Sequence, residues 1–376
     1  MLGLYFHIPF CVKKCAYCDF VSTERQSLIA PYMHALQKET EIVGGMYNKA
    51  VDSVFFGGGT PSFIDEAYIR RIMNTVRRDF KFAADAEVTL EANPCSLSRE
   101  KVYAYRDAGI NRLSIGLQAA QDSHLKTLGR QHNVAMFDNA FDLAREAGFE
   151  NINIDMIYAL PGQTVREWEE TLFHALHKKP EHISAYALKI EEGTPMARMA
   201  AAGEITPVDE EMDVRMYHMA QAILDNKGYD NYEISNFAIN GYECAHNLKY
   251  WNLKDYIGLG VSAHSCIDRL RFANTGDIHE YIENMGKGRL RYEQSDFIGD
   301  TERKIEYIML KLRLKKGFLL YDYKRRFGTD FLTEYAPEIE KACGEGLCVV
   351  QNDCVLPTKK GFDLQNQLVS ILIANL

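Results

Sequence analysis

The sequence of 376 residues lacks any apolar run approaching the roughly 18 residues that a membrane-spanning helix needs. Its first residues, Met1–His7, lack the basic region and the small-residue cleavage site of a secretory signal peptide. No internal repeat or low-complexity tract interrupts the chain, and its 11% aromatic content argues against disorder. These absences predict a globular protein of the cytoplasm.

Positive charge and cysteine are both scarce. The chain has 43 Lys and Arg against 52 Asp and Glu, a formal net charge of −9, so the basic footprint of a nucleic-acid-binding protein is missing. Nine cysteines are too few for a disulfide framework. Cys11, Cys15 and Cys18 nevertheless share one short segment, and clustered cysteines in a reducing compartment indicate a metal site or catalysis.

The first half of the chain alternates short runs of β-branched and aromatic residues with longer amphipathic stretches. The expected strands are residues 2–7, 51–56, 86–91, 112–116, 152–157 and 183–188, and the expected helices are 29–43, 65–80, 98–108, 134–147 and 164–177. Repeated strand–helix units predict a parallel sheet with helices outside it. Asp65, Ser98 and Thr164 are the expected N-caps of three of these helices.

Polar residues collect where the expected strands end. The turn Gly57–Ser62 follows the second strand, Glu91 closes the third, Gln118 follows the fourth, and Asp155 lies towards the end of the fifth. Barrel enzymes build their sites on this carboxyl-end face. The placement therefore favours an α/β fold with a partial parallel (β/α)6 barrel, similar to a TIM barrel, over an open doubly wound sheet.

Three regions are expected along the chain. Residues 1–228 form the barrel domain, and residues 229–300, rich in aromatic residues, Asn and Gly, form an irregular covering or linking segment. Residues 301–376 form a small, mainly helical, winged-helix-like domain, because about 75 residues suffice for such a unit.

The cysteine segment has the spacing C-x3-C-x2-C and follows the first strand. Three thiolates on a tight loop can each bind one iron of a cubane cluster and leave the fourth iron open. Zinc would need a fourth protein ligand, for which His7 is a conceivable donor. Three buried structural cysteines fit less well, because Lys13 and Lys14 lie between the first two and require a partly solvated loop.

Several motifs together resemble the radical S-adenosylmethionine superfamily and, within it, the oxygen-independent coproporphyrinogen III oxidase family. The resemblance rests on Tyr5-Phe-His7-Ile-Pro9-Phe-Cys11, the cysteine loop, Gly57-Gly-Gly59-Thr60-Pro61-Ser62, Glu91-Ala-Asn-Pro94, Arg112-Leu-Ser-Ile-Gly-Leu-Gln118, Leu128-Gly-Arg130-Gln-His132 and Ile154-Asp155-Met-Ile-Tyr-Ala-Leu-Pro161-Gly162. It covers nearly the whole chain, including a C-terminal domain like that family's.

The resemblance implies one [4Fe-4S] cluster on Cys11, Cys15 and Cys18, with S-adenosylmethionine chelating the open iron and yielding methionine and a 5′-deoxyadenosyl radical on reduction. It further assigns Gly58, Gly59 and Thr60 to the methionyl amino group, Glu91 and Asp155 to cationic or hydroxylic parts of the cofactor, and Gln118 and Arg130 to its ribose and carboxylate. Tyr5 and Tyr17 are expected beside the cluster and adenine. A helix cap or a plain chain reversal is the structural alternative for each carboxylate and glycine.

Two departures from the oxidase pattern change the expected function. The oxidases carry a fourth cysteine two positions after the third, where this chain has Phe20, and their long N-terminal extension has no counterpart before Tyr5. Both features resemble the HemW subfamily, which binds haem and is thought to deliver it to haem proteins. The segment His246-Asn247-Leu-Lys-Tyr250-Trp251 also matches that subfamily's H-N-x-x-Y-W motif.

His246 is the expected haem ligand, because imidazole is a common axial ligand and the motif's Tyr and Trp offer flat faces for a porphyrin. The alternative is a capped turn in which His246 is only hydrogen-bonded. His264, in the segment 258–265, is a weaker candidate, as a single histidine on an apolar segment.

The expected function is a radical S-adenosylmethionine-type haem chaperone, with haem as its cargo and haem proteins as its acceptors. The alternatives are an oxygen-independent coproporphyrinogen III dehydrogenase and a zinc-stabilised binding module without redox chemistry. The basic cluster Lys315-Lys316 and Lys324–Arg326 could contact the anionic surface of the cytoplasmic membrane. Such clusters are more often solvated helix faces. A homodimer is left open.

Overall fold

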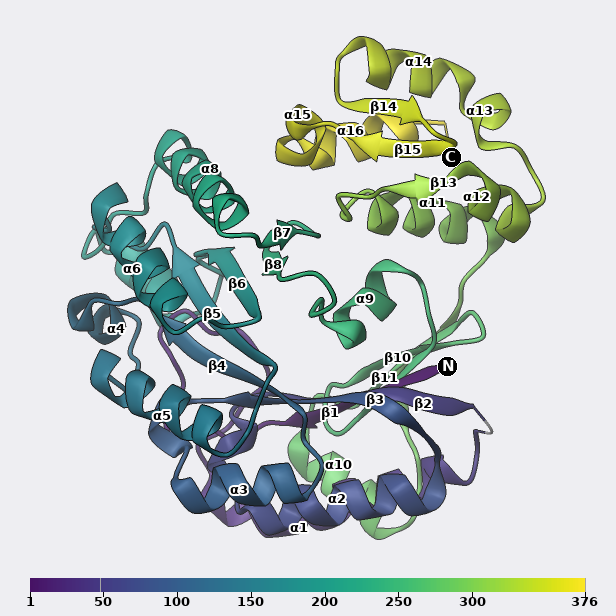
Figure 1. Ribbon diagram of the computed structural model, residues 1–376. Coiled ribbons are helices and arrows are strands. Elements are labelled where there is room, and N and C mark those ends of the chain that lie inside the picture. The colour runs from purple at the N-terminus through teal and green to yellow at the C-terminus, as the bar shows by residue number, and fades with distance from the viewer. Residues whose placement is uncertain (48, 376) are drawn as a thin grey trace.

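A computed structural model describes residues 1–47 and 49–375 of the chain. Six parallel strands form the centre of a twelve-stranded sheet and follow one another in chain order across it. They are β1 (Leu2–Ile8), β2 (Ala50–Gly58), β3 (Lys81–Ala92), β4 (Arg112–Gln118), β5 (Ile152–Tyr158) and β6 (His182–Ala187). The sheet curves, and its connecting helices cover the outer side (Figure 1). The expected α/β architecture with a mainly parallel sheet is confirmed.

Six α-helices connect the parallel strands in the described chain. They are α1 (Ile29–Gly44), α2 (Glu66–Asp79), α3 (Arg99–Asp107), α4 (Asp122–Thr127), α5 (Val134–Glu146) and α6 (Val165–His177). Four of them (α2, α3, α5 and α6) begin after a capping side chain. Asp65 accepts from the Ala67 N–H ahead of α2, and Ser98 accepts from the Lys101 N–H ahead of α3, so both expected caps are present. Each satisfies a backbone donor that would otherwise lack a partner in the first turn.

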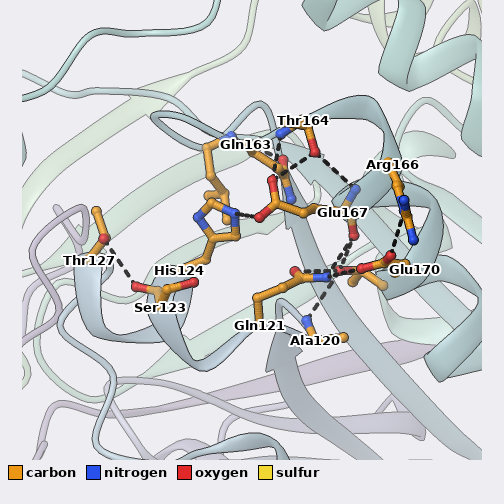
Figure 2. Close-up of polar contacts among 12 residues, drawn as sticks. Ala120, Gln121, Ser123, His124, Thr127, Gln163, Thr164, Arg166, Glu167 and Glu170 are labelled. Carbon is orange, nitrogen blue, oxygen red and sulfur yellow. Dashed lines mark hydrogen bonds and ion pairs between the residues drawn. The ribbon is translucent and has the colours of Figure 1, made fainter.

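The third expected cap, Thr164, belongs to a polar network that joins α4 to α6 (Figure 2). Thr164 and Glu167 form a reciprocal capping box at the start of α6. On the facing side, the Gln121 amide donates to the Glu167 carbonyl at 3.0 Å, and His124 Nε2 lies 3.4 Å from a Glu167 carboxylate oxygen. The network therefore fixes α4, which leads into the turn that carries Arg130.

Residues 229–300 differ from the irregular layer expected for them, because they contain six strands that extend the sheet on both sides. Beyond β6 lie β8 (Asn236–Ala238) and β7 (Asp230–Asn231), and beyond β1 lie β9 (Tyr256–Leu259), β10 (His264–Ile267), β11 (Leu270–Asn274) and β12 (Tyr292–Phe297). β9 pairs in parallel with β1. This pairing gives hydrogen-bond partners to backbone N–H and C=O groups of β1 that would otherwise have none. β9 is therefore a regular strand despite its glycine-rich sequence.

Four more helices complete the first 300 residues: α7 (Pro195–Ala201), α8 (Glu210–Asn226), α9 (Ala245–Trp251) and α10 (Ile278–Gly286). α8 covers the outer side with α6, whereas α9 lies on the concave inner side of the sheet (Figure 1). α9 thereby carries the motif that begins at His246 into the interior of the barrel.

The C-terminal region is mainly helical, as expected, and has its own apolar core centred on Tyr307, Phe318 and Tyr323. It contains α11 (Asp300–Lys311), α12 (Leu320–Phe327), α13 (Phe331–Glu334), α14 (Ala336–Gly344), α15 (Lys359–Asp363) and α16 (Gln365–Leu372), with a three-stranded sheet of β13 (Phe318–Leu319), β15 (Cys354–Pro357) and β14 (Cys348–Gln351). Among the helices described, none is long and apolar enough to cross a bilayer.

Candidate cofactor site

The cysteine loop leaves the carboxyl end of β1 and is held by backbone hydrogen bonds to two distant segments. The Cys11 N–H donates to the Thr23 carbonyl at 3.0 Å, and the Ala16 N–H donates to the Leu128 carbonyl at 3.0 Å. Cys11, Cys15 and Cys18 are half-buried free thiols. The fold thus presents all three on one short, anchored loop.

Two of the thiols receive side-chain hydrogen bonds from other elements. Thr60 Oγ1 donates to the Cys11 sulfur at 3.5 Å, and Arg130 Nη1 lies 3.7 Å from the Cys15 sulfur. A guanidinium so placed can donate a charge-assisted hydrogen bond to a metal-bound sulfur. Burial raises the pKa of the Cys11 and Cys18 thiols, so metal binding there must release protons.

The glycine turn after β2 packs against the start of the cysteine loop. The N–H groups of Gly59 and Thr60 donate to the carbonyls of Ile8 and Phe10, and the Gly58 N–H donates to the Glu91 carboxylate at 3.3 Å. A Cβ on Gly59 would lie 2.9 Å from the Ile8 carbonyl oxygen. Because these N–H groups are committed, the turn can offer a ligand only carbonyl oxygens, which suit an amino group rather than an anion.

His7 holds the far end of the cysteine loop to β1. Its Nε2 lies 2.8 Å from the Val21 carbonyl, which only accepts, so Nε2 carries the proton and Nδ1 accepts from the Tyr5 hydroxyl at 3.2 Å. Burial lowers the pKa of His7, which keeps the ring neutral. Both nitrogens are therefore occupied, and the zinc-ligand role considered for His7 has no free atom to use.

A cavity of about 210 Å³ lies inside the barrel, between the strand ends and α9. We call it the inner cavity; its lining includes Tyr5, Glu91, Arg112, Asp155, His246 and Tyr250. Both Asp155 carboxylate oxygens accept hydrogen bonds, from Ser114 at 2.7 Å and from Asn153 at 2.8 Å. Burial and the nearby Asp155 charge raise the pKa of Glu91 to about 8. The two expected carboxylates thus share one pocket.

Gln118 and Arg130 meet on the cysteine-loop side of the same sheet. A Cβ added to Gly116 would lie 2.4 Å from the Gln118 amide nitrogen and 3.0 Å from Arg130 Nη2. Gln118 has a positive φ of 66°, which bends the chain where β4 ends. Tyr17 packs with the cluster of apolar residues that includes Leu128, beside Arg130. The structure thus brings Tyr17, Gln118 and Arg130 together around Cys15.

His246 is buried in α9, and each of its ring nitrogens has a partner. Nδ1 lies 2.9 Å from the Ser53 hydroxyl and Nε2 lies 2.9 Å from the Tyr250 hydroxyl. Burial first, and the Lys249 and Arg112 charges second, lower the pKa of His246 to about 3. A bond from this ring to haem iron would require one of these hydrogen bonds to break.

A second, more open cavity of about 470 Å³ lies on the other side of Tyr5 and Tyr250. We call it the outer cavity; its lining includes Tyr5, His7, Phe20, Tyr250, Tyr256 and His264. Sequence reasoning gave His264 little weight and missed Tyr256. The missed signal is period-two alternation in β10, where Ser265 and Ile267 are buried and His264 is exposed on the opposite face.

The spacing of the cysteine thiols and other metal-binding side chains distinguishes a single zinc ion from an iron–sulfur cluster. Among the described residues, no three His, Cys, Asp or Glu side chains lie close enough together to hold a single ion. Tetrahedral zinc needs its ligands around one atom, whereas a cubane takes each thiolate on a different iron. The donor set therefore fits an iron–sulfur cluster better than zinc.

These features define the class of protein. Residues 5–175 match the radical SAM superfamily and residues 300–364 match the HemN C-terminal domain. The structure is similar to that of coproporphyrinogen III oxidase (HemN) from Escherichia coli, with a TM-score of 0.87 over 100% of this chain and 90% of that one, at 24% identity. That likeness shows the fold.

Full-length relatives then identify the family. The chain is 32% identical to the heme chaperone HemW of Bacillus subtilis, covering 100% of both sequences, and 32% identical to that of Escherichia coli, covering 99% of this chain and 98% of that one. It therefore belongs to the HemW family of radical SAM proteins. Membership implies a [4Fe-4S] cluster and S-adenosylmethionine, and it sets aside the zinc-stabilised module considered from the sequence.

Proposed function

We propose that this protein is a haem chaperone, which binds haem and transfers it to haem proteins. The relatives that match it over their full length are named heme chaperones. One observation supports particular residues for haem binding. In the outer cavity, beside the cysteine loop, His264 lies among aromatic rings, and no hydrogen bond of its ring is found among the described residues. Contact with the membrane surface and a homodimer remain expectations.

The proposed cluster ligands are Cys11, Cys15 and Cys18. S-adenosylmethionine, when bound, supplies a reductively cleavable sulfonium. Around it, the Gly58–Thr60 turn would accept from the amino group, and Arg130 would attract the carboxylate. Glu91 and Asp155 would accept from hydroxyl groups, with Tyr5, Tyr17 and Gln118 packing beside the cofactor. The proposal is supported by the contacts that already join these residues without a ligand.

The proposed seat of haem is the outer cavity, with His264 as the axial ligand. His264 is exposed, and no hydrogen bond of its ring is found among the described residues, so it can bind iron without breaking an existing bond. The faces of Tyr250 and Tyr256 and the 64% exposed Phe20 offer apolar area for a porphyrin. The inner cavity is smaller than the roughly 300 Å³ at which drug-sized ligand sites begin, so His246 faces too little space for the ring.

A paired substitution tests this placement. His264→Ala should shift the Soret band and weaken haem affinity by more than the roughly tenfold that loss of an outer-sphere partner costs. His246→Ala, the matched control from the other candidate, should keep the haem spectrum while losing stability, because it leaves Ser53 and Tyr250 without a partner. Both variants should retain iron and sulfide. The reverse pattern would overturn the His264 assignment in favour of His246, and absence of haem binding by the unaltered protein would overturn the function.

A further inference from the structure

Arg112, the first residue of β4, makes no side-chain hydrogen bond or salt bridge within the described part of the chain, although the Glu87 and Asp155 charges lie near it. Its side chain is 2% exposed, and Nε is shielded from solvent without a hydrogen-bond acceptor. Nowhere in residues 1–47 and 49–375 is a hydrogen bond or ion pair of its guanidinium found. A buried donor in this state is costly, because Nε has lost water and gained no acceptor in return.

The acceptors nearest to Arg112 are already used by other donors. The Glu87 carboxylate accepts the Ala245 and His246 N–H groups at the start of α9, both at 3.0 Å. The Asp155 carboxylate accepts from Ser114 and Asn153. Neither acid lies within 4.0 Å of the guanidinium as a salt bridge. A cation thus lies inside the barrel with two carboxylates near it, while the hydrogen bonds of those carboxylates go to other donors.

Arg112 lines the inner cavity, so a ligand can reach it. The polar lining at this end also includes Ser184 and His182, whose Nδ1 lies 2.6 Å from the Asn153 side-chain oxygen. The cavity is too small for a porphyrin ring but has room for one acid-bearing arm. Tyr5 and Tyr250 line both cavities, so the inner and outer cavities are neighbours.

We propose that Arg112 is the binding site for a ligand carboxylate in the inner cavity. The planar guanidinium fork matches a carboxylate with two parallel hydrogen bonds. Two ligands could supply the group: a propionate of the haem cargo, which rests on the proposed function, or the methionyl end of S-adenosylmethionine.

The experiment compares reconstituted unaltered protein with Arg112→Gln, and with Arg71→Gln on the exposed face of α2 as a charge control. Three probes are titrated: haem, haem dimethyl ester, whose carboxylates are blocked, and S-adenosylmethionine. The unaltered protein and Arg71→Gln should bind haem about tenfold or more tightly than the ester, since a charge-assisted hydrogen bond is worth about that factor. Arg112→Gln should bind the two equally and bind S-adenosylmethionine as before.

The other outcomes are equally decisive. If Arg112→Gln instead loses about tenfold or more of its affinity for S-adenosylmethionine, the carboxylate site stands and belongs to the cofactor, even if haem does not bind and the proposed function fails. If Arg112→Gln changes neither affinity, the residue is structural and the proposal is overturned. Should Arg112→Gln not fold, Arg112→Lys keeps the charge and loses the fork. Unchanged haem, ester and cofactor affinities in that variant overturn the proposal too.

Discussion

At the scale of single residues, the cysteine loop depends on donors that come from elsewhere in the chain. Arg130 reaches Cys15 from the turn after α4, and Thr60 reaches Cys11 from the turn after β2. Cys18 sits in the same loop with its N–H on the Cys15 carbonyl. The loop is therefore pre-positioned by the barrel, and its thiols need only lose their protons when a cluster binds.

Serine in place of Cys11, Cys15 or Cys18 should each abolish the cluster. A hydroxyl is a far weaker ligand for iron than a thiolate, and a cubane held by two thiolates is not retained. Cys95→Ser is the matched control, because that half-buried thiol lies against Asn93 rather than in the loop. Iron and sulfide are counted on anaerobically reconstituted protein. Full content in any of the three loop variants would remove that cysteine from the ligand set.

His132 should make stability depend on pH. Burial first, and the Arg130 charge second, lower its pKa to about 4 from an ordinary value of 6.5. The neutral ring donates from Nε2 to the Leu117 carbonyl and accepts from Arg130 at Nδ1. The unfolded chain takes up a proton below pH 6.5 and the folded chain does not, so stability present above pH 6.5 is lost as pH falls towards 4.

The expected loss is on the order of 1–3 kcal/mol of unfolding free energy between pH 6.5 and 4. His132→Gln should flatten that part of the profile, measured by urea unfolding at several pH values. His34→Gln, an exposed position on α1, serves as the comparison and should leave the slope as it is. An unchanged slope in His132→Gln would show that other groups govern the acid limb.

At the scale of elements, local signals were enough for the six parallel strands. Each of β1 to β6 was expected within a few residues, since each contains a short run of apolar and β-branched residues and helices separate successive strands. The edge strands could not be found this way. β7 has two residues and β8 three, too short for alternation to register, and β9 is a strand only because β1, some 250 residues earlier, pairs with it.

The same distinction holds for the site. Glu91 and Asp155 were correctly expected in one pocket, but Asp155 lies in the middle of β5 and not towards its end, so the pocket reaches into the barrel interior. Arg112 escaped notice because it begins its strand instead of ending it. Its burial depends on α9, which packs on the concave inner side of the sheet (Figure 1). No local sequence pattern near Arg112 predicts that packing. Burial of a residue by a helix far away in the sequence cannot be predicted from local patterns in a single sequence.

At the scale of the whole molecule, the C-terminal region contacts the barrel through apolar packing of Leu253 on its core and through polar pairs. His218 on α8 lies 2.9 Å from the Asp363 carboxylate, and Glu233 forms a bridge with Leu314. Lys315, part of the basic cluster considered for a membrane surface, pairs with Asp230 of the barrel at 2.6 Å. At least one of these cations therefore has an intramolecular partner.

The fold alone does not separate a chaperone from an oxidase, because the Escherichia coli oxidase shares it over the full chain. The expected difference lies at Phe20, which lines the outer cavity at the position where the resemblance places the oxidases' fourth cysteine. A phenyl ring can neither ligate iron nor exchange a proton, whereas it can cover the face of a porphyrin. With haem in the outer cavity as proposed, Phe20 would contact the macrocycle without reacting with it.

Reconstituted protein supplied with reductant and S-adenosylmethionine should not convert coproporphyrinogen III to protoporphyrinogen IX. Phe20→Cys should not restore the reaction, because Tyr250, Tyr256 and His264 would still shape the outer cavity for haem. Product is followed by porphyrin fluorescence after oxidation, with the Escherichia coli oxidase as the positive control and haem binding by the same preparation as proof of a competent site. Product that scales with S-adenosylmethionine would make this chain an oxidase. Haem bound without turnover is what a carrier requires, since a cargo must leave unchanged.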